Sequence, residues 1–131
     1  ETYIFTNNLS KSVLMTGYLS DAEISSLYKK ALIYVFPSVE EGFGIPVLEA
    51  FAMRTPVVAS NAEAMVEIAE GAAEHYNAGD HIELFKTLSK LITSKSKRTY
   101  LAEKGTERLK GFSRERFVKD YERLILKSVK N

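Results

Sequence analysis

The apolar residues of this chain alternate between short unbroken runs and longer stretches with a helical period. Unbroken runs predict parallel strands that are covered on both faces. Stretches in which apolar residues recur every three or four positions predict amphipathic helices. The predicted strands are 13–16, 32–36, 56–60 and 73–76, and the predicted helices are 20–31, 46–53, 62–70, one opened by Asp80, 96–110 and one opened by Ser113.

Polar residues mark where the helices begin. Ser20 with Glu23, and Asp80 with Glu83, have the spacing of a capping box, and Asn61 is expected to cap a further helix. The residues expected on buried helix faces are Ile24, Leu27, Tyr28 and Ala31 in the first helix, Leu84, Phe85, Leu88, Leu91 and Ile92 after Asp80, and Phe117, Tyr121, Leu124 and Ile125 in the last.

This alternation of strand and helix predicts right-handed βαβ units. The expected fold is therefore α/β, a Rossmann-like three-layer sandwich around a parallel sheet. The 131 residues fit a single domain. Sheets of this kind usually have about six strands, so we expect the first strand or strands to precede Glu1. A first residue other than Met also favours a piece of a longer protein.

Composition narrows the range of partners. The formal net charge is +1, which gives no electrostatic reason to expect a nucleic acid. The absence of cysteine excludes disulfides and cysteine–zinc sites and favours a reducing compartment. No stretch is long and apolar enough to span a bilayer. We expect a cytoplasmic protein, and association with the inner face of a membrane stays open.

Candidate ligand-binding residues lie in the loop after the second predicted strand. Ligands of parallel α/β sheets bind beyond the carboxyl ends of the strands, which is where this loop begins. The loop ends in Glu41, Gly42, Phe43, Gly44 and Ile45. Glycine allows close approach of the backbone and positive φ. The next helix, opened by Pro46, offers the N–H groups of Val47 and Leu48 and a positive dipole end. Together these features predict an anion cradle suited to phosphate.

Glu49 follows in the same helix among apolar neighbours, which predicts a buried carboxylate. Unpaired, such a group would cost several kcal/mol by order of magnitude. It therefore needs a partner, which hydroxyls of a ligand or a basic side chain would supply. Alternatively, Glu49 is an acid favoured by the helix dipole. Glu41, taken alone beside Glu40, is most simply a solvated acid.

Residues 37–60, PSVEEGFGIPVLEAFAMRTPVVAS, resemble the retaining glycosyltransferases of family 4, also called group 1, which have the two-domain GT-B architecture. The family signature is a glutamate, seven residues and a second glutamate, and it stands here as Glu41 and Glu49. Weaker resemblance extends through 13–31, 78–92 and 112–124. The chain departs from the family at Arg54, where a small residue is usual, and at Val66, where a proline is common.

The resemblance implies a role for each matching residue. Glu49 would hold the ribose hydroxyls of a nucleotide, and Glu41 would hold the donor sugar and act in catalysis. The backbone around Gly42, Phe43, Gly44, Ile45, Val47 and Leu48 would hold the donor sugar and its diphosphate, and Tyr18 and Leu19 would frame the base. The chain would be the later part of the C-terminal, donor-binding domain. The acceptor domain and the cations that neutralise the diphosphate would precede it.

The implied activity is transfer of a sugar from a nucleotide-diphosphate donor with retention of configuration. No Asp-x-Asp pair or histidine cluster is present to bind a metal, and no cofactor is expected. The full-length parent would be the enzyme, and this piece alone would be inactive. Two alternatives stay open: a non-catalytic nucleotide-sugar-binding or scaffolding module, and an enzyme like glycogen synthase, starch synthase or a sugar phosphorylase.

Overall fold

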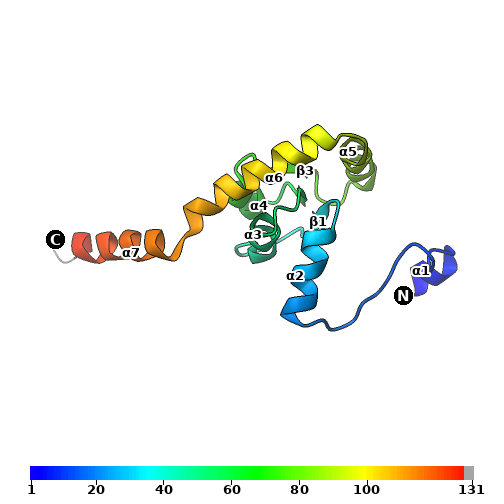
Figure 1. Ribbon diagram of the computed structural model, residues 1–131, viewed down its shortest axis with the longest axis horizontal. Coiled ribbons are helices and arrows are strands. Elements are labelled where there is room, and N and C mark those ends of the chain that lie inside the picture. The colour runs from blue at the N-terminus through cyan, green and yellow to red at the C-terminus, as the bar shows by residue number, and fades with distance from the viewer. Residues whose placement is uncertain (129–131) are drawn as a thin grey trace.

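Three parallel strands form the centre of the domain. The computed structural model describes residues 1–128, with the side chains of residues 114, 124, 127 and 128 outside that description. The strands are β1 (Tyr34–Phe36), β2 (Val57–Ser60) and β3 (Ala73–Tyr76), and they lie in the order β1-β2-β3 (Figure 1). The register pairs Phe36 with Ala59 and Ser60 with Tyr76. The predicted α/β fold with a parallel sheet is confirmed.

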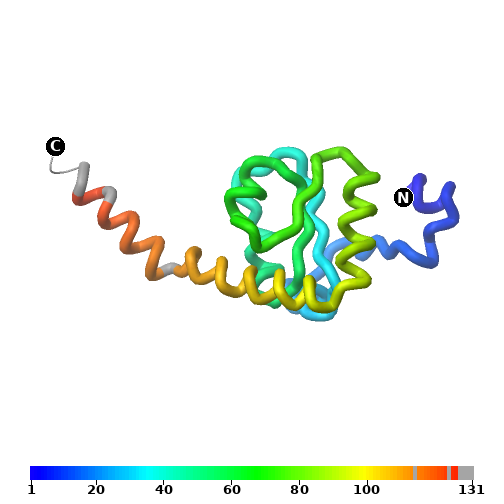
Figure 2. Tube along the Cα trace, turned by 90° about the horizontal axis from the view of Figure 1, so that it is seen from above, coloured from blue at the N-terminus to red at the C-terminus, as the bar shows by residue number. Residues whose placement is uncertain are grey.

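Helices cover both faces of this sheet (Figure 2). The helical segments of the described chain are α1 (Thr2–Thr6), α2 (Asp21–Lys30), α3 (Ile45–Ala52), α4 (Glu63–Ala69), α5 (His81–Thr93), α6 (Lys95–Leu109), the 3-10 turn η1 (Lys110–Phe112) and α7 (Arg114–Ser128). Of these, α1 and α7 lie away from the sheet (Figure 1). Phe51 of α3 and Met65 of α4 pack on one face with Ala59. Leu91 of α5 and Leu101 of α6 pack on the other face. The sheet is therefore the middle layer of three.

The predicted strand over 13–16 is wrong. Residues 13–17 have no regular structure, and the side chains of Leu14 and Met15 are 83% and 61% exposed. A strand is stable only when its backbone groups pair with a neighbour. In the described part of the chain the sheet consists of β1, β2 and β3, and this segment pairs with none of them.

Several predicted helix faces are also not buried. Ile24 and Leu27 of α2 are exposed, as are Phe85 and Ile92 of α5. On α7, Phe117, Tyr121 and Ile125 are exposed, and the side chain of Leu124 lies outside the described residues. The stripe on α7 is exposed because this helix projects away from the body of the domain (Figure 1). An apolar stripe shows which face can pack, but the packing partner must come from elsewhere.

The predicted helix starts are confirmed in part. Ser20 and Glu23 form the full capping box of α2, with the Ser20 N–H donating to Glu23 Oε2 at 2.8 Å. The hydrogen bonds from Ser20 lower the pKa of the Glu23 carboxyl. Ser113 accepts from the backbone N–H of Arg116 at 3.2 Å and so caps α7.

Two other predicted caps differ from the structure. Ala62, and not Asn61, stands before α4, because the Asn61 side chain instead contacts Asn77 and the Ala78 N–H. Asp80 does cap α5, but Glu83 accepts from the Asn77 N–H at 2.7 Å and does not complete the box. Both polar side chains stabilise the turn after β3.

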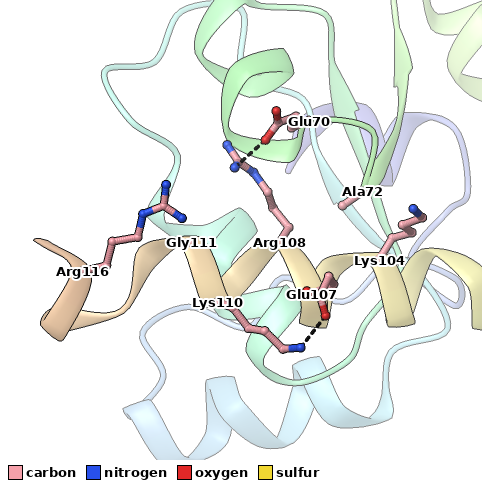
Figure 3. A pocket seen from close by; sticks show the side chains of 8 residues that line it. All are labelled: Glu70, Ala72, Lys104, Glu107, Arg108, Lys110, Gly111 and Arg116. Carbon is pink, nitrogen blue, oxygen red and sulfur yellow. Dashed lines mark hydrogen bonds and ion pairs between the residues drawn. The ribbon is translucent and has the colours of Figure 1, made fainter. Parts of the chain in front are cut away.

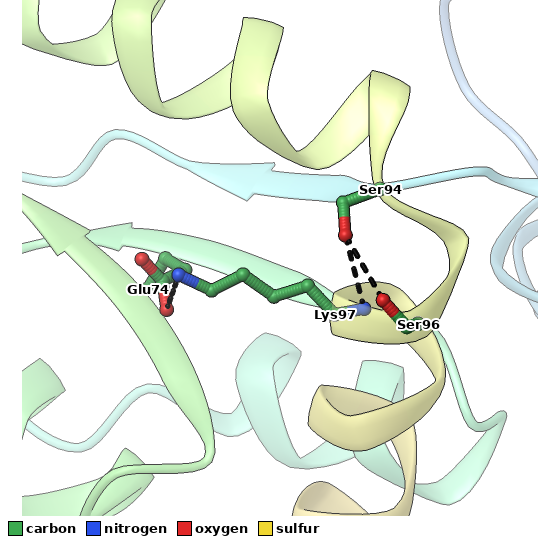
Figure 4. Close-up of polar contacts among 4 residues, drawn as sticks. All are labelled: Glu74, Ser94, Ser96 and Lys97. Carbon is green, nitrogen blue, oxygen red and sulfur yellow. Dashed lines mark hydrogen bonds and ion pairs between the residues drawn. The ribbon is translucent and has the colours of Figure 1, made fainter.

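Helix α6 is tied to the edge strand β3 by side-chain contacts (Figure 4). Ser94 caps α6 by accepting from the backbone N–H of Lys97 at 3.3 Å. The Lys97 ammonium reaches the Glu74 carboxylate of β3 at 2.9 Å. Both side chains are partly exposed, so this ion pair contributes at most about 1 kcal/mol.

Arg54, one of the two departures from the family pattern, follows α3 with a φ of +58°. A side chain in this left-handed region costs roughly 1–2 kcal/mol relative to the right-handed one. Glycine would remove that cost, while losing roughly 0.5–1 kcal/mol to its greater freedom when unfolded. Glycine therefore suits this backbone conformation better than arginine does.

We predict that Arg54→Gly raises the free energy of unfolding by about 0.5 kcal/mol, the difference between these two effects. Urea denaturation would measure it. Arg54→Ala is the matched control, since it shortens the side chain but keeps the Cβ, and no gain is expected from it. A glycine variant less stable than the alanine variant would contradict the explanation.

Candidate functional site

The loop between β1 and α3 carries most of the predicted site residues. Gly44 ends it with a φ of +90° and is buried. A Cβ at this position would overlap Cε of Met65, a residue of α4 that packs beneath the turn. Gly42 has neither constraint, because its φ is not positive and open space surrounds it. Only Gly44 of the two is therefore required by the local structure.

The start of α3 is partly used by the turn itself. The Val47 N–H donates to the Gly44 carbonyl at 3.0 Å, and the Val47 side chain is completely buried. Pro46 has no N–H to offer. The predicted anion cradle is thus narrower than expected, because the donor at Val47 already has a partner. The positive end of the helix dipole remains at this point.

Glu49 is not buried, and this expectation is wrong. Its side chain is exposed on the second turn of α3. The residues that α3 buries are Val47, Ala50 and Phe51, whereas Ile45 and Ala52 are exposed although they are apolar. Apolar residues all round a helix predict burial on every side, but the neighbours in this structure cover only one side. Desolvation therefore imposes no cost that a ligand must offset.

Glu49 nevertheless has a partner in the protein. The Tyr28 hydroxyl of α2 donates to Glu49 Oε2 at 3.3 Å. The Tyr28 ring packs edge-on against Tyr34 of β1, with ring centroids 5.0 Å apart. Partial burial, with smaller effects of Tyr34 and Glu49, raises the pKa of the Tyr28 hydroxyl well above its ordinary value. Tyr28 therefore stays protonated at neutral pH and remains a donor.

The sequence did not identify Tyr28 as part of the site. It assigned this residue to the buried face of its helix, and the structure does have it packed at the edge of the core. Nothing in the sequence indicates that α2 would bring the hydroxyl to α3. The contact fixes one oxygen of the carboxylate and leaves the other free to accept.

Glu41 lines an open cleft between the loop and the start of α4, with a volume of about 380 Å³. Four carboxylates line this cleft, those of Glu40, Glu41, Glu63 and Glu67. Such a surface attracts hydroxyl donors and cations and disfavours phosphate. Glu63 and Glu67 were not among the predicted site residues. Both belong to α4, which brings them beside the loop that carries Glu41.

The other side of the loop is apolar. Phe43 packs edge-on against Phe112 of η1, with ring centroids 6.1 Å apart. Phe43 and Leu48 line a groove of about 500 Å³ that continues to Phe117 of α7. Ile45 is exposed. The loop therefore separates an acidic cleft from an apolar groove.

Tyr18 and Leu19 lie in the segment before α2. The Tyr18 side chain is 98% exposed and Leu19 is half-buried. Their segment has no regular structure until α2 begins at Asp21. An almost fully exposed side chain has few neighbours in the protein, so the structure does not bring Tyr18 into contact with the loop after β1.

The sequence profile of the family "Glycosyl transferases group 1" matches residues 3–108, which is most of the chain. The chain belongs to the group 1 glycosyltransferases. The matched range includes β1, β2, β3 and the loop that carries Glu41 and Glu49. The alternation of strand and helix and the glutamate pair thus fall within one family pattern.

Curated relatives agree with this assignment. The chain is 35% identical, over 90% of its length, to "Uncharacterized glycosyltransferase MJ1178" of Methanocaldococcus jannaschii. It is 34% identical, over 82% of its length, to "MMP alpha-(1->4)-mannosyltransferase" of Mycolicibacterium hassiacum, and 33% identical, over 67%, to "Serotype-specific mannosyltransferase WbdA" of Escherichia coli. The chain spans only 34%, 27% and 11% of the lengths of these three relatives.

Solved structures of related proteins have the same architecture. The C-terminal domain of a glycosyl transferase group 1 family protein, LpcC from Francisella tularensis, superposes with a TM-score of 0.72 at 28% identity, covering 83% of this chain and 57% of that one. Sucrose-phosphate synthase from Thermosynechococcus elongatus superposes with a TM-score of 0.86 over 98% of this chain and 33% of that one. At 23% identity, the second likeness supports the fold alone.

A third hollow in this glycosyltransferase domain has a structural explanation. It has a volume of about 350 Å³ and is lined by both basic and acidic residues (Figure 3). They are Lys104, Arg108, Lys110 and Arg116 with Glu70 and Glu107. Arg108 donates from Nε to the Ile68 carbonyl at 2.8 Å and from Nη2 to the Glu67 carbonyl at 2.9 Å, and it pairs with Glu70. These carbonyls end α4, so the guanidinium closes that helix.

Neither a metal cluster nor a membrane-spanning helix is found in residues 1–128. No three histidine or acidic side chains in this range lie close enough together to hold a metal ion. None of the described helices is long and apolar enough to cross a bilayer. Independence from metals stays a prediction.

We predict that Gly44→Ala destabilises the domain by about 2 kcal/mol, through its positive φ and the overlap with Met65. Gly42→Ala is the matched control, because a Cβ there meets nothing and the backbone is unstrained, and it should change stability by less than about 0.5 kcal/mol. Chemical denaturation of both variants would measure the difference. Equal effects of the two substitutions would rule out the proposed role of Gly44.

Proposed function

We propose that the full-length protein is a retaining, metal-independent hexosyltransferase of glycosyltransferase family 4, and that this chain is the later part of its donor-binding domain. The donor is a nucleotide-diphosphate sugar, with mannose as the transferred sugar. An acceptor-binding domain and the cations that neutralise the diphosphate come from parts of the protein outside this chain. The chain alone is inactive, because donor binding is incomplete and the acceptor site is absent.

The observation that carries this proposal is the glutamate pair beyond the carboxyl end of β1, in a chain that matches the group 1 family over residues 3–108. Glu49 is held by Tyr28 from α2, and Gly44 sets the turn between the two glutamates. Mannose is favoured because WbdA and the Mycolicibacterium hassiacum relative are named mannosyltransferases.

Each glutamate then has a distinct role. Tyr28 occupies Oε2 of Glu49, and Oε1 accepts hydrogen bonds from the ribose hydroxyls of the nucleotide. Glu41 accepts from hydroxyls of the donor sugar in the acidic cleft, and its charge offsets the positive charge that develops at the anomeric carbon. The diphosphate lies toward the start of α3, near Phe43, Gly44 and Ile45, on the side of the loop away from the acidic cleft. Tyr18 and Leu19 frame the base.

We predict that Glu49→Gln in the full-length protein raises the donor KM roughly ten- to a hundredfold, because hydrogen bonds to a charged group contribute roughly 1.5–3 kcal/mol. Glu41→Gln should instead lower kcat by roughly a hundredfold or more, because its charge acts in the transition state. Release of nucleoside diphosphate from GDP-mannose, UDP-glucose and ADP-glucose, with methyl α-mannoside as acceptor, would measure both constants.

Glu40→Gln is the matched control, since Glu40 is the adjacent exposed acid in the same cleft, and its constants should stay within about twofold of wild type. A full-length protein that binds these donors but transfers no sugar would instead be a non-catalytic module. Unchanged constants for both Glu41→Gln and Glu49→Gln would refute the proposed roles.

We also predict that saturating EDTA leaves the transfer rate unchanged, because no metal is needed to hold the diphosphate in the proposed mechanism. Nuclear magnetic resonance of the product would give the anomeric configuration at the earliest time points. A rate that falls with EDTA and recovers with Mg²⁺ would contradict metal independence, and a product of inverted configuration would contradict retention.

A further inference from the structure

Ser60 is a completely buried polar residue at the carboxyl end of β2. Its hydroxyl donates to the carbonyl of Ser38, which lies 22 residues earlier in the loop after β1. The Ala62 N–H approaches the same hydroxyl oxygen at 3.5 Å and leaves its hydrogen directed at Ser38. The hydrogen bond therefore joins the ends of two neighbouring strands at the edge where ligands of such sheets bind.

Ser38 extends this connection toward Glu41. Its hydroxyl donates to the Glu40 carbonyl at 2.8 Å and lies 3.5 Å from Glu41 Oε2. A hydroxyl has one hydrogen, and the shorter contact holds the peptide bond directly before Glu41. That peptide sets the direction in which the Glu41 side chain leaves the backbone. Rotation of the same hydroxyl would turn its hydrogen to the carboxylate.

Ser60 is also held by its other neighbouring strand, β3. The Ser60 carbonyl lies 2.9 Å from His75 Nδ1 of β3. A carbonyl oxygen only accepts, so Nδ1 carries the hydrogen of this bond. The Asn61 N–H donates to the Tyr76 carbonyl at 2.8 Å directly after it. Contacts with β3 therefore hold the hydroxyl at a fixed position.

The loop has little else to hold it at this point. Val39, Glu40, Glu41 and Gly42 are all exposed. The Ser38 hydroxyl, whose hydrogen points to the Glu40 carbonyl, holds the peptide bond from which the Glu41 side chain leaves and lies 3.5 Å from Glu41 Oε2. The direction of this carboxylate thus depends on two serines, one of which lies outside the loop.

We propose that Ser60 and Ser38 are positioning residues for Glu41, acting through the hydrogen bonds from Ser60 to Ser38 and from Ser38 to Glu40. This inference rests on the proposed role of Glu41 at the donor sugar. Catalysis is sensitive to displacements of about 1 Å, which can cost roughly a hundredfold in rate. Glu49 lies outside this network, since its partner is Tyr28.

The test compares kcat and donor KM of Ser60→Ala and Ser38→Ala in the full-length protein, with GDP-mannose as donor and methyl α-mannoside as acceptor. Both variants should lower kcat about ten- to a hundredfold and leave KM within about twofold of wild type, because Glu49 still holds the nucleotide. Ser38→Thr keeps the hydroxyl in a position that is only half-buried, and it should restore most of the lost kcat.

Ser94→Ala is the matched structural control, since it likewise removes one serine hydroxyl that is hydrogen-bonded to the backbone, but at the start of α6. It should leave kcat and KM unchanged. Backbone chemical shifts give a readout that needs no activity: those of residues 39–42 should change in Ser60→Ala and Ser38→Ala, and those of α3 should not.

The possible results separate the positioning role of the two serines from the proposed transferase function. An active wild type whose Ser60→Ala and Ser38→Ala variants keep their kcat would overturn the positioning role alone. A rise in KM that matches the fall in kcat would also overturn it, because the effect would then be general misfolding. A wild type that transfers no sugar from any of the donors tested would overturn the proposed function and this role with it.

Discussion

The burial of β2 on both faces is the constraint on which the rest of the domain depends. All four residues from Val57 to Ser60 are fully buried, between β1 and β3 and between two layers of helices. Apolar burial of this extent fixes the strand in one register. The ends of β1 and β3 are then aligned with its own end, and the loop that carries Glu41 and Glu49 starts from that edge.

The sequence predicted the elements whose partners are close in the chain. The predicted strand 73–76 has the same limits as β3. The predicted strands 32–36 and 56–60 agree with β1 and β2 to within two residues at each end. The predicted strand 13–16 is not a strand in the structure, although most of its residues are apolar, as in the strands predicted at 32–36 and 56–60. Its backbone has no neighbouring strand to pair with, and apolar composition alone cannot supply one.

The candidate site was predictable where it depends on local sequence and not where it depends on packing. The glycine before α3 and the glutamate spacing are local features, and both stand at the expected edge of the sheet. The exposure of Glu49 and its contact with Tyr28 depend on which sides of α3 have neighbours. Exposed stripes on α2 and α7 have the same origin, since periodicity defines a face without defining what covers it.

The loop after β1 is held at both of its ends by one neighbouring segment of the chain. Ser60 supports its beginning through Ser38, and Met65 lies beneath its end at Gly44. Both contacts come from the β2–α4 segment, residues 57–69, through the fully buried residues Ser60 and Met65, which do not line the cleft. Substitution of buried residues in that segment can therefore shift the loop, and with it the activity, while the residues that line the cleft stay the same.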